Sequence, residues 1–210
     1  IVVAVDDDQN QRIYPEEVKY VIRTNHQKDY VQAAHFINFS GAELCVLQHE
    51  FGIFGGDQGV FVLPLINRLQ IPLLVIFHTL LKNPSYLQKA VIREIGTTAS
   101  KITAMSHLAI QFLRNIYGQP AEKVNLIEHG VPDFGGSSQI KLKQHYGFDD
   151  RMVILTFGLL GRNKGIETAL HALSTVVEKH PEVLYIILGK THPYVIKVSG
   201  EEYRDYLKML

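Results

Sequence analysis

The stretch "ILTFGLLGRNKGIETALHAL", residues 154–173, passes from an apolar run through glycines and basic residues into an amphipathic pattern. This order is typical of a β-strand, a tight turn and an α-helix. Gly158 and Gly161 follow the expected strand, and Lys164 and Gly165 stand where the helix should begin. Because the first N–H groups of a helix and its dipole favour anions, the pattern indicates a phosphate site.

Two common phosphate motifs do not fit this turn. A P-loop needs Gly-Lys-Ser/Thr, but here Lys164 precedes Gly165 and Ile166 follows. The dinucleotide fingerprint G-x-G-x-x-G is also absent. A glycine turn with a solvated lysine would produce the same residues, so spacing alone leaves both interpretations open.

Working outward from this stretch, short apolar runs alternate with helical patterns along the chain. We expect strands at 1–5, 44–47, 72–77, 102–104, 124–127, 152–157 and 184–188. Helical patterns cover 15–24, 29–38, 59–69, 85–97, 106–117 and 165–180, with Ser106 as an N-cap. Strands that are apolar throughout fit a parallel sheet covered on both faces. The sequence therefore predicts a doubly wound α/β architecture.

The segment "PDFGGSSQ", residues 132–139, is the sharpest break in composition. We place a domain boundary there, with one domain at 1–134 and a second at 135–210. The second domain contains only two expected strands, too few for a complete doubly wound sheet, and we expect it to be incomplete.

The composition limits the functional classes. The chain has 210 residues, of which 46% are hydrophobic and 20% charged, as in a soluble globular protein. Lys+Arg and Asp+Glu are both 21, which argues against a general nucleic-acid binder. Cys45 is the single cysteine, so a disulfide framework is excluded and a reducing cytoplasm is the expected location. No apolar run reaches the ~18 residues of a membrane span. The oligomeric state is left open.

The glycine–lysine stretch resembles the start of the nucleotide-sugar domain in retaining glycosyltransferases of family 4, which have the GT-B fold of two facing Rossmann-like domains. In that family the basic residues of the motif hold the donor diphosphate. Lys164 and Gly165 match the motif. The position of the family arginine is Leu159 here, and Arg162 is the candidate to replace it.

Further segments resemble the same family in the same order: "LQHEFGIFGGDQG", "PLLVIFHTLL", "TAMSHLAIQFLRNIYG", "VNLIEHGVPDF" and "LGKTHPYVIKVSGEEYRDYL". The resemblance implies two Rossmann-like domains of GT-B type, the second truncated and the first without its initial strand and glycine-rich turn. The second acidic motif of the family, Glu-x₇-Glu, lies beyond this stretch of chain. We therefore expect a fragment of a longer enzyme that is inactive alone.

The resemblance also assigns roles to residues at strand ends. It implies that His78 and His49 are catalytic, and that Glu50, Gly55, Gly56, His129, Gly130 and His192 line the cleft. From the residues alone, His49 also reads as a capping histidine beside a tight turn, and His129 as a plain turn residue. The dipeptide His49-Glu50 does not begin a zinc-protease motif, because Ile53 occupies the second histidine position.

The acidic run Asp6, Asp7 and Asp8 offers metal ligands, but such runs are more often solvated loops, and we expect no metal site. The implied function is transfer of a sugar, of hexosyltransferase type, from a nucleotide-diphosphate sugar to a carbohydrate or glycan hydroxyl with retention, without a further cofactor. Two alternatives stay open. One is another two-Rossmann sugar enzyme, an epimerase or phosphorylase. The other is a non-catalytic sugar- or nucleotide-binding module.

Overall fold

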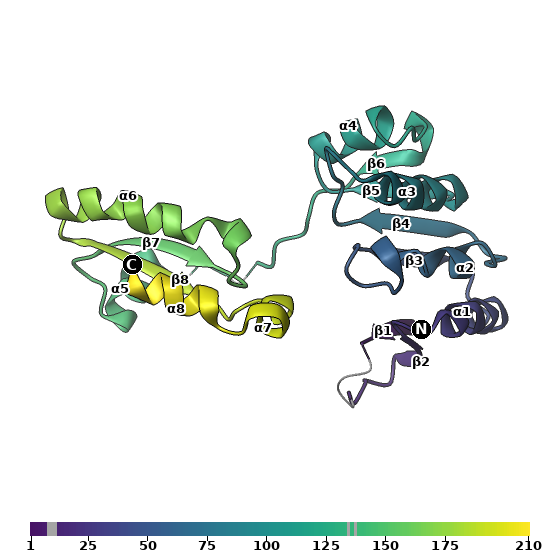
Figure 1. Ribbon diagram of the computed structural model, residues 1–210, viewed down its shortest axis with the longest axis horizontal. Helices are drawn as coiled ribbons and strands as arrows, with labels where there is room; N and C mark the ends of the chain where they lie inside the picture. Colours follow the sequence, from purple (N-terminus) through teal and green to yellow (C-terminus); the bar gives the residue numbers. More distant parts are fainter. Residues whose placement is uncertain (8–11, 134, 137) are drawn as a thin grey trace. The chain divides into compact units, whose positions relative to one another are not determined.

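The computed structural model describes residues 1–7, 12–133, 135–136 and 138–210. The chain forms two compact units, Ile1–Val131 and Pro132–Leu210 (Figure 1). The division falls at the first residue of the segment that we expected to link the domains. Phe134 and Ser137 of that segment, and Asp8 of the acidic run, lie outside the described residues.

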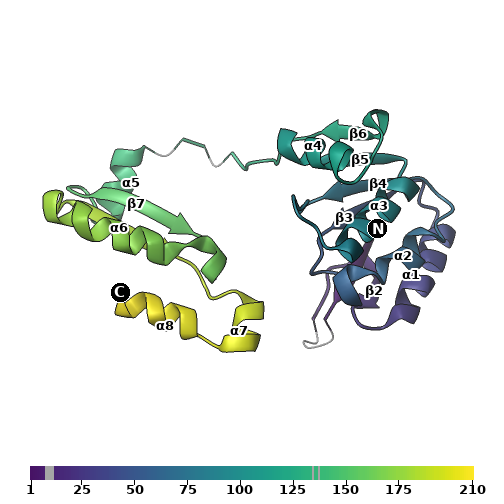
Figure 2. The same cartoon turned by 45° about the horizontal axis from the view of Figure 1, so that its top comes forward.

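The first unit holds a four-stranded parallel sheet in the order β3-β4-β5-β6. Its strands are β3 Cys45–His49, β4 Leu73–Phe77, β5 Lys101–Ala104 and β6 Val124–Leu126. A second sheet in the same unit pairs β1 (Val2–Asp6) with β2 (Val18–Arg23), also in parallel. Figure 2 shows this pair beside the β3 end of the larger sheet. The parallel pairing of these strands bears out the expected α/β class.

Helices connect and cover these strands. They are α1 Gln27–Phe39, η1 Asp57–Gly59, α2 Val62–Ile66, α3 Tyr86–Thr98, α4 His107–Asn115 and η2 Ala121–Lys123. Ser85 and Gln88 form a capping box at the start of α3. The Ser106 side chain accepts a hydrogen bond from the Ala109 N–H, 3.1 Å, which confirms the predicted N-cap of α4. The core between sheet and helices contains Val75, Ile92 and Ile102, all fully buried.

The helix expected at 15–24 is wrong, because this segment forms strand β2. Pro15 followed by glutamates favoured a helix start, but the sequence VKYVIR is rich in β-branched and aromatic residues. Its even positions Val18, Tyr20 and Ile22 are more buried than their neighbours, which is the period of a strand. Pairing with β1 therefore overrides the local helix signal. The helix expected at 59–69 is also shorter than predicted and covers only Val62–Ile66.

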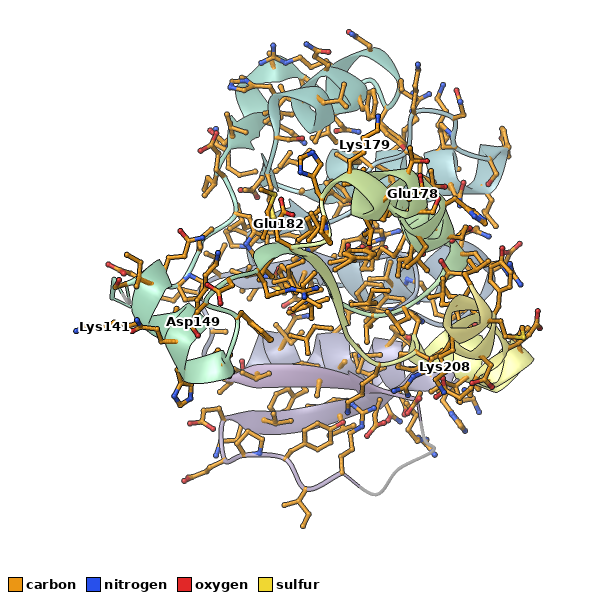
Figure 3. The ribbon with its side chains drawn as sticks, turned by 90° about the vertical axis from the view of Figure 1, so that its left-hand side faces the viewer. Lys141, Asp149, Glu178, Lys179, Glu182 and Lys208 are labelled. Carbon is orange, nitrogen blue, oxygen red and sulfur yellow. The ribbon has the colours of Figure 1, made fainter. Side chains whose placement is uncertain are left out.

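The second unit consists of α5 Gln139–Tyr146, β7 Met152–Phe157, η3 Arg162–Lys164, α6 Ile166–Lys179, β8 Val183–Leu188, α7 Pro193–Ser199 and α8 Glu202–Met209. β7 and β8 pair in parallel. Side chains of α6, β8 and α8 share one apolar cluster around Leu160, Ile166 and Tyr203. Charged residues such as Lys141, Glu178 and Lys208 extend from the surface of this unit (Figure 3).

Several apolar side chains of β7 are not covered by the described parts of the second unit. Leu155 is 54% exposed and Phe157 77% exposed, although both lie in a strand. Across the described residues, no helix is both long and apolar enough to cross a membrane.

Candidate functional site

The glycine turn of the second unit brings the ends of two strands into backbone contact. Gly158 follows β7 with φ of 125°, a conformation that strongly favours glycine. Gly189 follows β8, and a Cβ atom on it would lie 1.8 Å from the Gly158 carbonyl oxygen. The Leu160 N–H then donates to the Lys190 carbonyl, 2.7 Å. The two strand-end loops therefore run side by side, and glycine is required at both positions.

The turn continues through η3 into α6. Gly161 precedes η3, and Gly165 is the N-cap of α6 with φ of 61°. Lys164, between them, is exposed, and its ammonium has no ion-pair or hydrogen-bond partner in the part of the chain that the structure describes. A mobile cation thus stands at the end of a parallel strand and the start of a helix, where anions bind readily.

Arg162 is engaged with α8. Its Nη2 donates to Glu202 Oε1, 3.0 Å. Its guanidinium carbon lies 5.4 Å and 5.6 Å from the ring centroids of Tyr203 and Tyr206, within the range of cation–π contacts. The pair joins residues 40 positions apart and fixes the turn to the last helix.

The start of α6 already holds a carboxylate. The Tyr203 hydroxyl donates to Glu167 Oε2. Burial, together with this bond to Glu167, raises the pKa of Tyr203 to about 12, while the nearby N–H groups of Ile166 and Glu167 act in the opposite direction. The hydrogen bond from Tyr203 in turn lowers the pKa of Glu167. The sequence predicts N–H groups at the start of α6 that are free to bind an anion. The Tyr203 hydroxyl and the Glu167 carboxylate lie against these N–H groups instead. Among the described residues of the turn, Lys164 is therefore the cation that is exposed and unpaired.

His192 lies beside this turn through its backbone. Its N–H donates to the Leu160 carbonyl, 2.9 Å, and Thr191 bridges to Leu160 in parallel register. The Thr191 hydroxyl donates to Glu201 Oε2, which ties the loop after β8 to the start of α8. The backbone of His192 thus lies next to the glycine turn, and the expected role of His192 in lining the cleft stays a prediction.

In the first unit, the carboxyl ends of β3 and β4 bring Gln48 and His78 together. His78 Nε2 lies 2.7 Å from Gln48 Oε1. Because an amide oxygen only accepts, Nε2 carries the hydrogen and Nδ1 holds the lone pair of the neutral ring. Both residues are exposed. His78 therefore presents an oriented imidazole at the sheet edge where ligands of open α/β sheets bind.

His49 points to the opposite face of the sheet. It pairs in register with Phe77, and successive strand residues face opposite sides, so it lies away from Gln48 and His78. Its ring is 0% exposed and is surrounded by Phe51, Phe54 and Phe77. No described residue hydrogen-bonds to either ring nitrogen. Burial lowers the pKa of His49 to about 4. This environment favours a packing role for His49 over contact with a substrate.

Glu50 links the loops that follow β3 and β4. Its Oε2 accepts a hydrogen bond from the Thr79 hydroxyl, 2.6 Å, and its Oε1 accepts from the Phe51 N–H, 3.0 Å. The carboxylate therefore holds the loop that begins at Phe51 against the residue after His78. Among the described residues it serves as a structural bridge beside the candidate site.

The glycine-rich loop after β3 is fastened to the end of β2. The Gly55 N–H donates to the Tyr30 hydroxyl, 2.9 Å, and that hydroxyl donates to the Thr24 carbonyl, 2.9 Å. A Cβ on Gly55 would lie 1.8 Å from the Thr24 oxygen. Gly56 has φ of 75° and is exposed. Glycine is needed here for close packing of the loop on β2.

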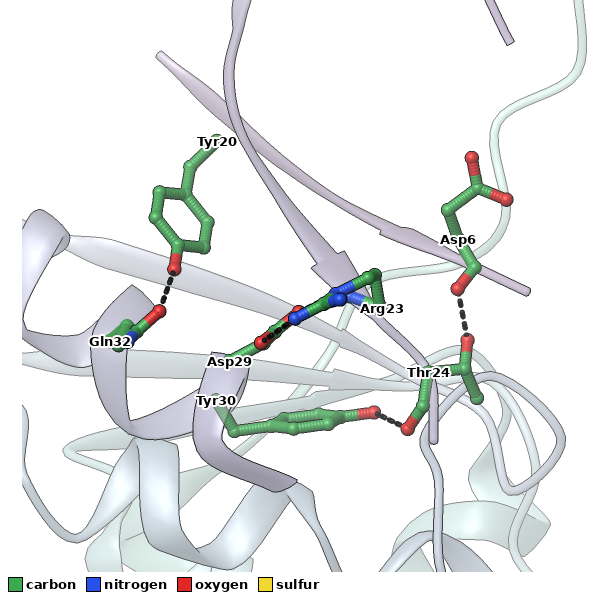
Figure 4. A network of polar contacts seen from close by, with 7 residues as sticks. All are labelled: Asp6, Tyr20, Arg23, Thr24, Asp29, Tyr30 and Gln32. Carbon is green, nitrogen blue, oxygen red and sulfur yellow. Dashed lines mark hydrogen bonds and ion pairs between the residues drawn. The ribbon is translucent and has the colours of Figure 1, made fainter. Parts of the chain in front are cut away.

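A polar network surrounds this junction (Figure 4). Thr24 donates from its hydroxyl to the Asp6 carbonyl, 2.8 Å. Arg23 forms a bidentate pair with Asp29, at 2.7 and 2.9 Å, which lowers the pKa of that carboxyl. These contacts fix the carboxyl ends of β1 and β2 to the first turn of α1.

Asp6 and Asp7 of the acidic run are engaged by neighbouring side chains. The Tyr14 hydroxyl donates to Asp6 Oδ2, 2.6 Å, and lowers its pKa. Arg12 approaches both carboxylates, at 3.8 and 3.7 Å. Within the described ranges, no group of three or more acidic, histidine or cysteine side chains is arranged to hold a metal.

His129 and Gly130 follow β6 at the end of the first unit. Both are exposed, and His129 Nδ1 donates to the Gly130 carbonyl, 2.9 Å. Their expected role in lining a cleft stays a prediction.

Sequence reasoning missed the partners of the predicted site residues. Gln48 orients His78, Thr79 binds Glu50, and Glu202 binds Arg162. A signal for Gln48 was present, since a polar residue inside an apolar strand next to a strand-end histidine is unusual. The contact between Arg162 and Glu202 has no local signal, because it spans two separate elements.

Several known proteins are similar to the chain, while no protein-family model matches it. A Bacillus subtilis protein named "Putative glycosyltransferase YtcC" is 24% identical over 127 residues, covering 56% of this chain and 31% of the relative. The crystal structure of Anabaena Alr3699/HepE in complex with UDP matches 90% of this chain and 51% of its own, with 19% identity and a TM-score of 0.63.

A solved glycosyltransferase from Rickettsia africae matches 88% of this chain and 58% of its own, with 14% identity and a TM-score of 0.55. The present chain thus spans about a third of the curated relative and just over half of each solved chain. The structural matches bear out the α/β fold of GT-B type that the sequence resemblance implied.

Proposed function

We propose that the full-length protein is a retaining glycosyltransferase that moves a sugar, of hexose type, from a nucleotide-diphosphate donor to a hydroxyl of a carbohydrate acceptor. The observation that supports this most is the glycine turn between β7 and α6, with Lys164 exposed and unpaired among the described residues. The relationship to YtcC and the UDP complex of the structural neighbour HepE agree with a nucleotide sugar as donor.

Lys164 would contact the diphosphate of the donor. When the bond between the sugar C1 and the diphosphate oxygen breaks, the sugar becomes oxocarbenium-like and the diphosphate gains negative charge. A lysine ammonium beside that oxygen stabilises the charge more in the transition state than in the ground state, which accelerates the reaction. The acceptor hydroxyl oxygen then forms the new bond to C1, and its proton passes to an oxygen of the departing diphosphate.

Gly158, Gly161 and Gly165 would let the diphosphate approach the backbone, because no side chain stands in the way. Arg162 would act indirectly, by holding the turn against Glu202 and Tyr203. On the acceptor side, His78 would position a sugar hydroxyl through Nδ1, with Gln48 fixing the ring. His129, Gly130 and His192 are proposed to line the site.

The first test is calorimetric titration of the full-length protein with UDP. Lys164→Ala should weaken binding about 10- to 150-fold, the scale of a hydrogen bond to a charged group. Lys179→Ala is the matched control, because it removes an exposed lysine at the C-terminal end of α6, the helix that begins two residues after Lys164. Equal affinities of the wild type and both variants would exclude this turn as the diphosphate site.

Turnover distinguishes the proposed reaction from its alternatives. A glycosyltransferase converts a UDP-sugar only when an acceptor is present, and its product has the anomeric configuration of the donor. An epimerase would change the sugar without an acceptor, and a phosphorylase would need inorganic phosphate. Binding without turnover under all three conditions would indicate a non-catalytic module.

A further inference from the structure

Three consecutive residues at the end of β3 hold the first two residues after β4. Gln48 Oε1 accepts from the His78 ring, 2.7 Å, and the His49 carbonyl accepts from the His78 N–H, 3.0 Å. Glu50 Oε2 accepts from the Thr79 hydroxyl, 2.6 Å. His78 is thus held by its ring, by its backbone and through the residue that follows it.

The Glu50 carboxylate is itself fixed at both oxygens. While Oε2 takes the Thr79 hydroxyl, Oε1 accepts from the Phe51 N–H, 3.0 Å. Hydrogen bonds to an ionised acceptor are among the stronger ones in proteins. The half-buried Glu50 side chain would have to break one of them to turn toward a substrate. Its contacts therefore favour an action through Thr79.

Tyr117, which follows α4, holds the same segment farther along. Its side chain is 0% exposed, and its hydroxyl accepts from the Leu81 N–H, 3.1 Å, and donates to the Leu81 carbonyl, 3.0 Å. One hydroxyl thus satisfies both backbone groups of a residue outside regular structure, as a neighbouring strand would. Burial raises the pKa of Tyr117, so the hydroxyl keeps the proton that it donates. Leu80, between the two anchored residues, packs against the core.

The far end of this segment, at Ser85, is fixed by the capping box of α3. Gln88 of that box also donates from Nε2 to Gln58 Oε1, 2.8 Å. Gln58 lies in η1, in the loop that follows β3, and has φ of 54°, a left-handed conformation that is unfavourable for a side chain. Such a conformation persists where the surroundings enforce it. The segments that follow β3 and β4 are thus braced against each other at both ends.

These bonds fall on a segment that has no regular secondary structure and carries an exposed histidine. An imidazole that only water surrounds samples several rotamers and both neutral tautomers. The bond to Gln48 selects one of each, but only while the backbone of His78 stays within reach of β3. A displacement of about 1 Å would lengthen the contact between Nε2 and Oε1 beyond hydrogen-bond range.

We propose that Glu50 and Tyr117 are positioning residues for His78. They hold the segment after His78 from the elements on either side of β4, Glu50 from the end of β3 and Tyr117 from the end of α4, which follows β5. The inference rests on the proposed role of His78 toward the acceptor, and it gives neither Glu50 nor Tyr117 a contact with substrate.

Nitrogen chemical shifts of the His78 ring, measured by NMR in the full-length protein at alkaline pH, test the proposal. The wild type should show one protonated nitrogen, Nε2, and one bare nitrogen, Nδ1. Thr79→Val removes the donor to Glu50, and Tyr117→Phe removes both bonds to Leu81, with little change in side-chain shape. In both variants the two nitrogen shifts should move toward each other, because the released ring exchanges between its tautomers.

Gln48→Ala defines the shifts of the fully released ring, because it removes the partner of Nε2. Wild-type ring shifts in Thr79→Val would overturn the role of Glu50. Wild-type ring shifts in Tyr117→Phe would overturn the role of Tyr117.

Tyr30→Phe is the matched control for Tyr117→Phe. Tyr30 is also 0% exposed, and its hydroxyl accepts from the Gly55 N–H and donates to the Thr24 carbonyl, both at 2.9 Å. The control therefore loses the same two kinds of bond at a different place in the unit, and its His78 shifts should stay those of the wild type. Equal movement of the His78 shifts in both variants would show a general loosening of the unit and overturn the role of Tyr117.

Thr98→Val is the matched control for Thr79→Val. The Thr98 hydroxyl, at the end of α3, donates to Asn67 Oδ1, 3.3 Å. Its removal likewise deletes one bond between a hydroxyl and a side-chain oxygen, away from the carboxyl end of β4. The His78 shifts should be unchanged in Thr98→Val, and a change as large as that in Thr79→Val would overturn the role of Glu50.

Steady-state kinetics with a UDP-sugar separate this inference from the proposed function. Thr79→Val and Tyr117→Phe should lower kcat about 10-fold, within the roughly 100-fold that a misplacement of about 1 Å costs. KM for the UDP-sugar should stay unchanged, because the donor diphosphate is proposed to bind at Lys164. Ring shifts that move without a change in kcat would support the positioning and overturn the role of His78 in the reaction. Ring shifts that do not move would overturn the positioning, whatever the turnover.

Discussion

His78 and Gln48 form a hydrogen bond across the carboxyl ends of β4 and β3, with Nε2 2.7 Å from Oε1. This bond fixes the ring and leaves Nδ1 as an acceptor in the neutral form. His49, one residue after Gln48, lies on the other face of the sheet among three phenylalanines. Two histidines that look equivalent in the sequence thus have opposite environments, and different consequences are expected from their substitution.

His78→Ala should lower the turnover of the full-length enzyme about 100-fold or more, the usual effect of removing a positioned imidazole. Its melting temperature should stay within about 2 °C, because surface substitutions have small effects on stability. Gln48→Ala should have a smaller effect in the same direction, since the imidazole remains but is no longer oriented. Steady-state kinetics with a UDP-sugar, together with thermal melts, checks both. A loss of stability without loss of turnover would show that His78 is a structural residue.

His49 should make the first unit sensitive to acid. Burial lowers its pKa from 6.5 to about 4, so the native state favours the neutral ring. Its stabilising contribution is complete above pH 6.5 and is lost as the pH falls toward 4. From linkage, the wild type should lose about 2 kcal/mol of unfolding free energy between pH 7 and pH 5 through this group.

The matched variant for this prediction is His49→Phe, which keeps an aromatic ring among Phe51, Phe54 and Phe77 but cannot titrate. Urea unfolding at pH 7 and pH 5 should show that, between these pH values, the variant loses about 2 kcal/mol less unfolding free energy than the wild type. Glu50 and His78 are the charged neighbours that also affect the His49 pKa, and both remain in the variant. If the wild type and His49→Phe lose the same unfolding free energy between pH 7 and pH 5, His49 is not the source of the acid sensitivity.

The sequence predicted the α/β class and most strands because buried parallel strands are apolar throughout, a signal that does not depend on distant contacts. It failed for Val18–Arg23, where Pro15 and two glutamates imitate a helix start and only pairing with β1 selects a strand. Local spacing also predicted that His49 and His78 lie at strand ends and that a glycine turn leads into α6, while their roles in a site stay predictions. The burial of His49 and the engagement of Arg162 by Glu202 depend on tertiary packing, which no local pattern encodes.

Gly55→Ala should destabilise the first unit by about 2–3 kcal/mol, as overpacking does. The added Cβ would lie 1.8 Å from the Thr24 carbonyl oxygen, so the loop must move away from β2 and strain its bond to Tyr30. Gly52→Ala is the control from the same loop, because a Cβ there meets no described atom within 4 Å. Urea denaturation should separate the two variants. Equal stabilities would show that the loop is not packed against β2.

Arg162→Ala separates a structural from a ligand-binding arginine. The exposed ion pair with Glu202 is expected to contribute less than about 1 kcal/mol, and the contacts with Tyr203 and Tyr206 add a similar amount. The unfolding free energy of the second unit should therefore fall by about 1–2 kcal/mol. Arg204→Ala removes an exposed arginine of α8, the helix that carries Glu202 and the two tyrosines, and serves as the control.

The affinity for UDP then decides the role of Arg162. If its guanidinium stays on Glu202 and the tyrosine rings, Arg162→Ala should weaken UDP binding by less than about threefold, far less than Lys164→Ala. Tyr203→Phe should behave in the same way, because it keeps the ring under Arg162 and loses only the hydrogen bond to Glu167. A loss as large as that of Lys164→Ala would instead mean that Arg162 leaves Glu202 and contacts the diphosphate when the nucleotide binds.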